Sequence, residues 1–298
     1  MRNLIAGLAL AAALATGSAA AQQVADPLVD LSVAQPAFAA NAGPHVVIDG
    51  AHNNFHTADG RYSPFATLLR NDGFRVDGSE APFSDESLAG VDILVIANPL
   101  ADENVGAWVT PNPSAFSAEE IAAVRRFVER GGALMLIADH MPFAGAAQDL
   151  AATFGFTFEN GFAMRQGNGA DLFTRQNGGL TDDPLLSGLA RLRTFTGSAF
   201  TAPEGARALI RLDRRYTVLL PHEAWAFEDD TPRTPGEGKL QGAVMEFGQG
   251  RVAMFGEAAM FTAQVAGPQQ WPVGLRAPGA EHNKQFALNV VRWLGGAD

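Results

Sequence analysis

Hydrophobic residues form short continuous runs in the first half of the chain, and these runs alternate with segments of helical spacing. The apolar runs cover 45–49, 74–76, 92–97 and 133–138. Between them, apolar residues recur every three or four positions in 63–71 and 117–131. Apolar strands that alternate with amphipathic helices predict a mostly parallel sheet with helices on both faces, so we expect an α/β fold.

The helix expected at 117–131 carries a start and a stop signal. Ser117 and Glu120 have the spacing of a capping box, in which each side chain bonds the backbone N–H of the other residue. Gly131 and Gly132 follow the apolar stripe, and glycine commonly ends a helix.

The second half has a less regular pattern. We expect a Gly- and Asn-rich loop over 161–179 and a helix over 183–192. Strands are expected over 208–212 and 217–220, a hairpin over 242–247 with 251–255, and a closing helix over 281–294. No internal repeat interrupts this order.

The N-terminal segment has the layout of a secretory signal. Arg2 precedes an apolar run over 4–15, and small residues at 19–21 form a cleavage site, which predicts a signal peptide over 1–21 and a periplasmic or secreted protein. This run falls short of the roughly 20 residues that span a bilayer, so we expect no stable membrane insertion. Residues 22–43 are expected to form a linker or a strap, and 44–298 a single domain.

Charge and cysteine content exclude several functions. The chain has 21 Lys and Arg against 32 Asp and Glu, a net charge of −11, and such a surface repels nucleic acid. It has no cysteine, which excludes a thiolate nucleophile, a disulfide and a thiolate metal site. We expect a small molecule or a carbohydrate as its ligand.

Polar residues follow the predicted strands. They are His52, Asn53, Asn54 and His56 after the first strand, Asn98 after the third, Asp139 and His140 after the fourth, and Glu257 after the hairpin. Because ligands bind outside the carboxyl ends of parallel strands, these residues predict a shared site.

Imidazole and carboxylate groups are the usual ligands of zinc and related ions. We expect His52, His56 and His140 to hold a divalent metal (Zn, Mn or Fe), with Asp139 and Glu257 as catalytic groups. Amides both donate and accept hydrogen bonds, so Asn53, Asn54 and Asn98, together with His222, are expected to bind substrate. The alternative is that these polar residues only cap helices and hold loops.

Four stretches carry a family resemblance: 46–62, 127–138 with its Gly-Gly pair, 250–264, and 282–294. They resemble the class I glutamine amidotransferase-like superfamily, including uncharacterised bacterial groups and trehalose-utilisation-type proteins. The resemblance implies a flavodoxin-like domain. True amidotransferases place a catalytic cysteine after the strand that follows the Gly-Gly pair, where this chain has Ala138, so glutamine hydrolysis by that mechanism is excluded.

Two functional hypotheses remain. In the first, the chain is an exported hydrolase that uses the expected metal; metal-free acid–base catalysis by Asp139 and Glu257 is a further alternative outside these two. In the second, it is a non-catalytic carbohydrate-binding or envelope-interaction domain that keeps the polar site for hydroxyl recognition.

Overall fold

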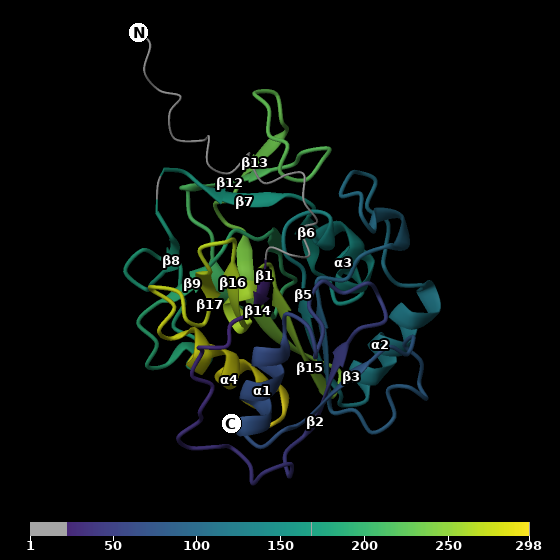
Figure 1. Cartoon of the computed structure of the whole chain (residues 1–298). Coiled ribbons are helices and arrows are strands. Elements are labelled where there is room, and N and C mark those ends of the chain that lie inside the picture. The colour runs from purple at the N-terminus through teal and green to yellow at the C-terminus, as the bar shows by residue number, and fades with distance from the viewer. Residues whose placement is uncertain (1–22, 168, 298) are drawn as a thin grey trace.

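A nine-stranded sheet forms the centre of the computed structural model, which describes residues 23–167 and 169–297 (Figure 1). Five of its strands run parallel, in the spatial order β3-β2-β4-β5-β15. Their bounds are β2 His45–Asp49, β3 Arg75–Ser79, β4 Ile93–Ala97, β5 Ala133–Ile137 and β15 Gly250–Phe255. The predicted parallel sheet is confirmed for this part of the molecule.

The other half of the sheet is antiparallel. β14 (Leu240–Phe247) pairs with β15 as the predicted hairpin, which turns at Gly248 with a φ of +61°. Beyond β14 lie β11 (Arg207–Arg211), β10 (Ala199–Thr201) and β6 (Thr157–Glu159). The sheet is therefore mixed, with a parallel half that carries the polar strand ends.

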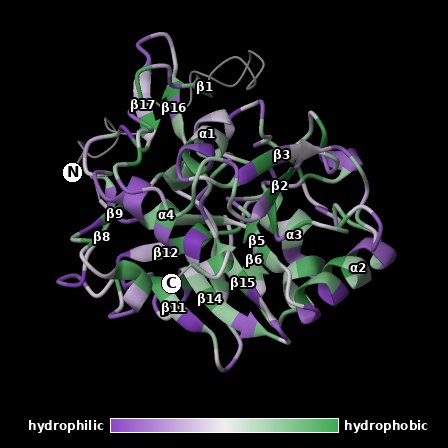
Figure 2. Cartoon of the chain, turned by 90° about the horizontal axis from the view of Figure 1, so that it is seen from below, coloured by the Kyte–Doolittle hydropathy of each residue, from purple (hydrophilic) through white to green (hydrophobic). Residues whose placement is uncertain are grey.

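Helices cover both faces of the sheet. α1 (Ser63–Asn71) and α4 (Asn283–Leu294) contribute to one buried cluster, and α2 (Ala118–Glu129) and α3 (Phe143–Ala152) to the other. Alternate residues of β5 face the two clusters: Met135 and Ile137 the first, Leu134 and Leu136 the second. Figure 2 shows this strand among hydrophobic segments near the centre, as the apolar sequence requires.

Smaller sheets and short helices surround this core. The sheets combine β7 (Phe162–Arg165), β12 (Tyr216–Leu219) and β13 (Arg233–Pro235); β8 (Asp171–Phe173) and β9 (Leu192–Thr194); and β1 (Gln23–Ala25), β16 (Ala263–Ala266) and β17 (Trp271–Gly274). The 3-10 helices are η3 (Asp102–Asn104), η4 (Pro184–Leu186) and η5 (Ala259–Phe261).

The helix predicted over 183–192 is wrong. Asp183 caps the single turn η4 by accepting a hydrogen bond from the N–H of Leu185, but Gly188 follows with a φ of +74°. A left-handed residue ends helical geometry, and the chain enters β9 at Leu192. The predicted loop 161–179 likewise contains β7 and β8.

The segment before β2 crosses the domain as a strap. β1 pairs with β16, and Leu31 and Phe38 pack against the core. The predicted signal peptide, 1–21, lies outside the described residues. Among the helices of 23–167 and 169–297, none has the length and apolar character needed to cross a membrane.

Candidate functional site

A pocket of about 440 Å³ lies at the carboxyl ends of the parallel strands. The chain goes from β2 to β3 on one side and then returns to β4 on the other, so strand order reverses between β2 and β4. This reversal is where open α/β sheets bind their ligands. The pocket is lined by residues of the loops after these three strands and of the start of α2, within 51–53, 80–82, 100–103 and 114–120. We call it the switch-point pocket.

His52 lies in the wall of the switch-point pocket between two carboxylates. Its Nδ1 is 2.8 Å from Asp49 Oδ2, and its Nε2 is 2.8 Å from Glu120 Oε1. Burial opposes the charged ring, but the hydrogen bonds and charges of Asp49 and Glu120 outweigh it and raise the pKa of His52. Because both ring nitrogens donate to carboxylates, His52 is an imidazolium ion held in one orientation.

Glu120 joins three segments at the pocket. Its Oε2 accepts hydrogen bonds from the N–H and the hydroxyl of Ser117, which confirms the predicted capping box. Its Oε1 accepts from His52 and from the N–H of Phe83. Burial favours the neutral acid, but these hydrogen bonds prevail and lower the pKa of Glu120 to about 2. The carboxylate is therefore ionised.

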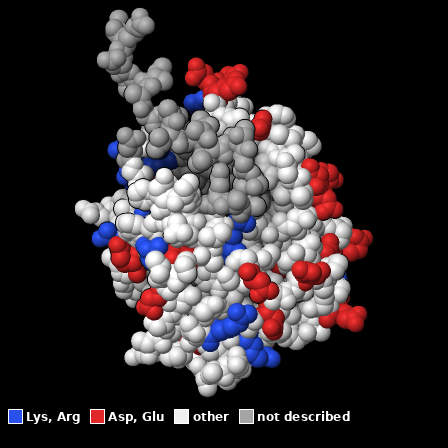
Figure 3. Space-filling model, in the orientation of Figure 1, with Lys and Arg blue, Asp and Glu red and all other residues white. Residues whose placement is uncertain are grey.

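The rim of the pocket is acidic. Glu80, Asp102 and Glu103 line it with exposed side chains, and Figure 3 shows acidic residues gathered on the side of the molecule where Figure 1 places α2. Asn53, which also lines the pocket, donates from Nδ2 to Leu100 O at 3.2 Å and to Asp102 Oδ1 at 2.7 Å. The pocket thus offers mainly hydrogen-bond acceptors and negative charge.

His56 is a buried, neutral part of the scaffold. Asn98 Nδ2 lies 3.3 Å from its Nδ1, and the Gln264 amide lies 3.1 Å from its Nε2. Since Asn98 Oδ1 accepts from the N–H of Asp139, its NH₂ group must face His56 Nδ1, so His56 Nε2 carries the ring hydrogen. The Gln264 amide, whose Nε2 is placed 3.1 Å away and whose buried Oε1 has no other partner, must then turn its oxygen toward this hydrogen. Burial and the positive charge of Arg61 lower the pKa of His56 to about 3.

The predicted asparagines have different positions. Asn54 is buried, and its Oδ1 accepts from the N–H of His52, which fixes the loop after β2. Asn98 adopts a φ of +56° and accepts from the N–H of Phe55 through its backbone oxygen, so it ties that loop to the end of β4. Of the three asparagines, Asn53 lines the pocket, whereas Asn54 and Asn98 hold its walls.

Asp139 and Glu257 form a buried carboxyl pair at the ends of β5 and β15. Glu257 is fully buried and accepts from the N–H groups of Ala259 and Met260 at 2.9 and 2.8 Å. Asp139 is 9% exposed and accepts from the N–H of His140 at 2.8 Å. Burial raises both pKa values, and the charge of Asp139 raises that of Glu257 further.

His140, which follows Asp139 in the chain, belongs to an aromatic patch. Its ring stacks on Phe162 with centroids 4.4 Å apart, and Trp225, which is 51% exposed, meets it edge-on at 4.8 Å. Trp108 lies 6.1 Å away. His222 is exposed beyond this patch, where its Nδ1 contacts Thr110 Oγ1 and holds two loops together. His222 therefore does not line the switch-point pocket.

The three histidines expected to hold a metal do not form a common donor set. Both ring nitrogens of His52 and of His56 have the partners given above, and His140 Nδ1 lies 2.7 Å from Met141 O. Within 23–167 and 169–297, no three His, Asp or Glu side chains are placed to hold an ion. The rings of His52 and His56 are engaged with other groups, and His140 lies apart from them in the aromatic patch, so the predicted three-histidine donor set is not assembled among the described residues. The metal itself stays a prediction.

No family model and no curated protein matches the chain. Solved structures share its fold. The mmIFT52 N-terminal domain is similar with a TM-score of 0.60 and 15% identity, over 84% of this chain and 97% of that one. Cytoplasmic protein STM1381 from Salmonella typhimurium has a TM-score of 0.52 and 13% identity, over 84% and 99%. A ThuA-like protein from Bacteroides uniformis has a TM-score of 0.45 and 12% identity, over 90% and 95%. The first two of these structures, with TM-scores above 0.5, share the fold of this chain.

Several pocket residues escaped the sequence-based prediction. Glu120 was recognised only as a helix cap, because a capping box carries no sign of the second partner that the fold brings to it. Glu80 follows β3, a strand end that the list of candidates did not include. Because ligands bind where the strand order reverses, the ends of the strands on both sides of this reversal are candidate positions, and they include Glu80.

Proposed function

We propose that this chain binds a hydroxylated small molecule, neutral or cationic, in the switch-point pocket. The observation that carries the proposal is the combination of place and chemistry: a pocket at the strand-order reversal lined by four carboxylates, Glu80, Asp102, Glu103 and Glu120, and by one amide, Asn53. Its volume of about 440 Å³ is in the range of small-ligand sites.

Sugar hydroxyls suit such a lining. An ionised carboxylate accepts hydrogen bonds from hydroxyl groups, and these charge-assisted bonds are stronger than neutral ones. Glu120 is held ionised, but its acceptor positions are taken by Ser117, His52 and Phe83, so it acts on a ligand through its charge. The rim carboxylates accept the hydroxyl hydrogen bonds, and Phe116 adds an apolar surface at the same wall. An anionic ligand would be repelled by the rim, whereas an amino sugar adds a favourable charge.

Three sugars that differ in charge test the proposal: glucose, glucosamine and glucuronate, titrated by calorimetry. We expect glucosamine to bind more tightly than glucose, and glucuronate least. Glu120→Gln keeps a capping residue but removes the charge, so it should weaken glucosamine binding by about tenfold. Glu119→Gln, next to it on α2 and outside the pocket lining, is the matched control. Equal affinity for all three sugars, or no binding, would reject the proposal.

A second candidate function, hydrolysis, is favoured by the Asp139–Glu257 pair. Burial raises the pKa of both carboxyl groups, and the charge of Asp139 raises that of Glu257 further, which suits general acid–base catalysis. Asp139 would accept a proton from a water molecule that attacks the substrate, and Glu257, which has no exposed surface, would act only through Asp139. The aromatic patch of Trp108, Trp225 and His140 would stack against the substrate.

Hydrolysis is tested with nitrophenyl glycosides and esters. We expect Asp139→Asn to abolish any turnover, while Asp149→Asn on α3 leaves it unchanged. The predicted metal dependence is tested separately, by elemental analysis of untagged protein beside His140→Ala. If the protein binds a ligand but turns over none of these substrates, binding is the only function that remains.

Membership of the class I glutamine amidotransferase-like superfamily also belongs to this proposal. It is supported by the 2-1-3-4-5 order of the parallel strands, a doubly wound order of the flavodoxin type, and by the stretches quoted above. Export through the N-terminal segment remains a prediction, which mass determination of the mature N-terminus tests.

A further inference from the structure

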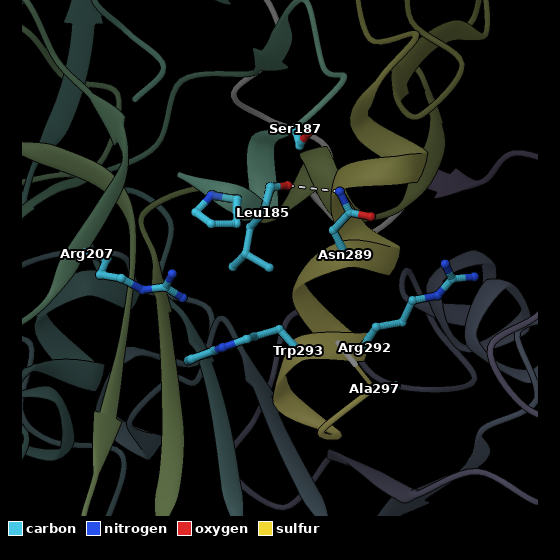
Figure 4. A pocket seen from close by; sticks show the side chains of 8 residues that line it. Leu185, Ser187, Arg207, Asn289, Arg292, Trp293 and Ala297 are labelled. Atoms are coloured by element: carbon cyan, nitrogen blue, oxygen red, sulfur yellow. Dashed lines mark hydrogen bonds between the residues drawn. The ribbon is translucent and has the colours of Figure 1, made fainter. Parts of the chain in front are cut away.

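A second cavity, of about 570 Å³, is lined by a different set of residues from the switch-point pocket, and Figure 4 shows it from close by. It is lined by η4, by α4 and by the start of β11. Arg251, near the start of β15, has its guanidinium carbon 5.4 Å from the ring centre of Trp293, so this wall of the cavity lies at the amino end of that strand. The two pockets therefore do not share a wall.

The charged lining residues of this cavity are both arginines. In the described part of the chain they are Arg207 and Arg292, and no carboxylate lines the cavity there. Their carboxylate partners, Asp183 and Asp72, lie outside the lining. The cavity therefore presents guanidinium N–H groups, which suit an anionic group, on a chain whose net charge is −11.

The two arginines differ in how firmly they are held. Arg292 forms a fork with the buried Asp72, with Nε–Oδ2 at 2.8 Å and Nη2–Oδ1 at 2.5 Å, and it is part of the wall. Arg207 faces Asp183 through Nη1 at 3.2 Å, and its side chain is 41% exposed. A guanidinium carries five N–H donors, so this single contact leaves Arg207 able to bind an incoming oxyanion.

The other walls are apolar and aromatic. The guanidinium carbon of Arg207 lies 5.5 Å from the ring centre of Trp293, and Figure 4 shows the two side chains extending toward one another. Leu185 lines the cavity beside them, and Asn289 Nδ2 donates to Leu185 O at 2.9 Å, which fixes η4 to α4. A ring or apolar group of a ligand would pack here, next to the arginine.

We infer that this cavity binds a small organic oxyanion, a carboxylate, sulfonate or phosphate ester, whose apolar or ring portion lies against Leu185 and Trp293 while its anionic group meets Arg207. The size of the cavity suits a ligand of this kind. This site is independent of the hydroxyl-binding site proposed above, and it takes ligands of the opposite charge.

Two probes that differ by one sulfonate test the inference on the wild-type protein. They are 1-anilinonaphthalene-8-sulfonate and its uncharged parent N-phenyl-1-naphthylamine, titrated by fluorescence. We expect the sulfonate to bind at least about tenfold more tightly than the parent, because a hydrogen bond to a charged group is worth that factor or more. Equal affinities, or no binding of the sulfonate, would overturn the inference.

Variants locate the binding. Arg207→Gln should weaken sulfonate binding by about tenfold and leave the parent unchanged, while Arg211→Gln, exposed on the same strand, should change neither. An equal effect of both variants, or none, would show that the probe binds elsewhere and would overturn the inference. If Arg207→Gln fails to fold, Arg207→Lys keeps the charge but not the fork, and it should retain a preference for the sulfonate, smaller than that of the wild type.

Discussion

Glu120 Oε1 lies 2.8 Å from His52 Nε2, so the residue that caps α2 also fixes a histidine of the loop after β2. This contact joins two sides of the switch-point pocket. The contact also sets the charge of His52, because Asp49 and Glu120 favour the imidazolium form of its ring. The charged ring in turn balances their negative charges. The pocket keeps its acidic character through the exposed carboxylates of its rim.

Replacing Glu120 by Gln should lower the pKa of His52. One of the two carboxylates that stabilise the imidazolium is lost, while the capping geometry is retained. The titration of the His52 ring, followed by NMR, measures this pKa. Glu119→Gln should leave the curve unchanged. Identical curves for wild type and Glu120→Gln would show that the contact does not hold the charge.

His56 should make the protein less stable in acid. Its folded pKa is about 3 against 6.5 in the unfolded chain, so the unfolded state binds an extra proton between these values and stability falls as pH decreases through this window. The slope contributed by His56 is at most about 1.4 kcal/mol per pH unit. Urea unfolding across pH 4 to 7 should show a smaller slope in His56→Gln than in wild type, and equal slopes would contradict this role of His56.

Asn98 should be more costly to replace than its backbone conformation alone explains. Asn98→Ala removes the acceptor of the Asp139 N–H and the donor to His56, and it places alanine at a φ of +56°. We expect a loss of about 2 to 4 kcal/mol. Asn41→Ala, exposed at a φ of +57°, isolates the backbone cost, which should be about 1 kcal/mol. Equal losses in denaturant unfolding would contradict the role given to the side chain.

The buried carboxyl pair of Asp139 and Glu257 should make the folded protein more stable at low pH than at high pH. Burial and the charge of Asp139 raise the folded pKa of Glu257, so the folded state binds more protons than the unfolded one above the unfolded value of 4.5. Stability is therefore lost as pH rises from there. Glu257→Gln should gain stability relative to wild type between pH 4.5 and 8, by at most about 1.4 kcal/mol per unit. A difference between the two proteins that stays constant over this pH range would contradict the effect of burial on Glu257.

Periodicity predicted the parallel half of the fold because each buried strand is apolar on both faces. The capping box at Ser117 was also predictable, since it depends on residues three apart. The turn at 183–192 was not, because Gly188 ends the helix against an otherwise helical pattern. Apart from Asp49, the side-chain partners of the His52 and His56 rings come from segments 42 to 208 positions away, and only the fold decides that these rings meet Glu120, Asn98 and Gln264.

The most direct test of the proposed function is to follow the ring signals of His52 by NMR while the wild-type protein is titrated with glucosamine. The account predicts a saturable shift of these signals, weakened about tenfold in Glu120→Gln and unchanged in Glu119→Gln. If the indole signals of Trp108 and Trp225 shift instead while those of His52 stay fixed, the ligand binds at the aromatic patch, and the switch-point pocket is not the site.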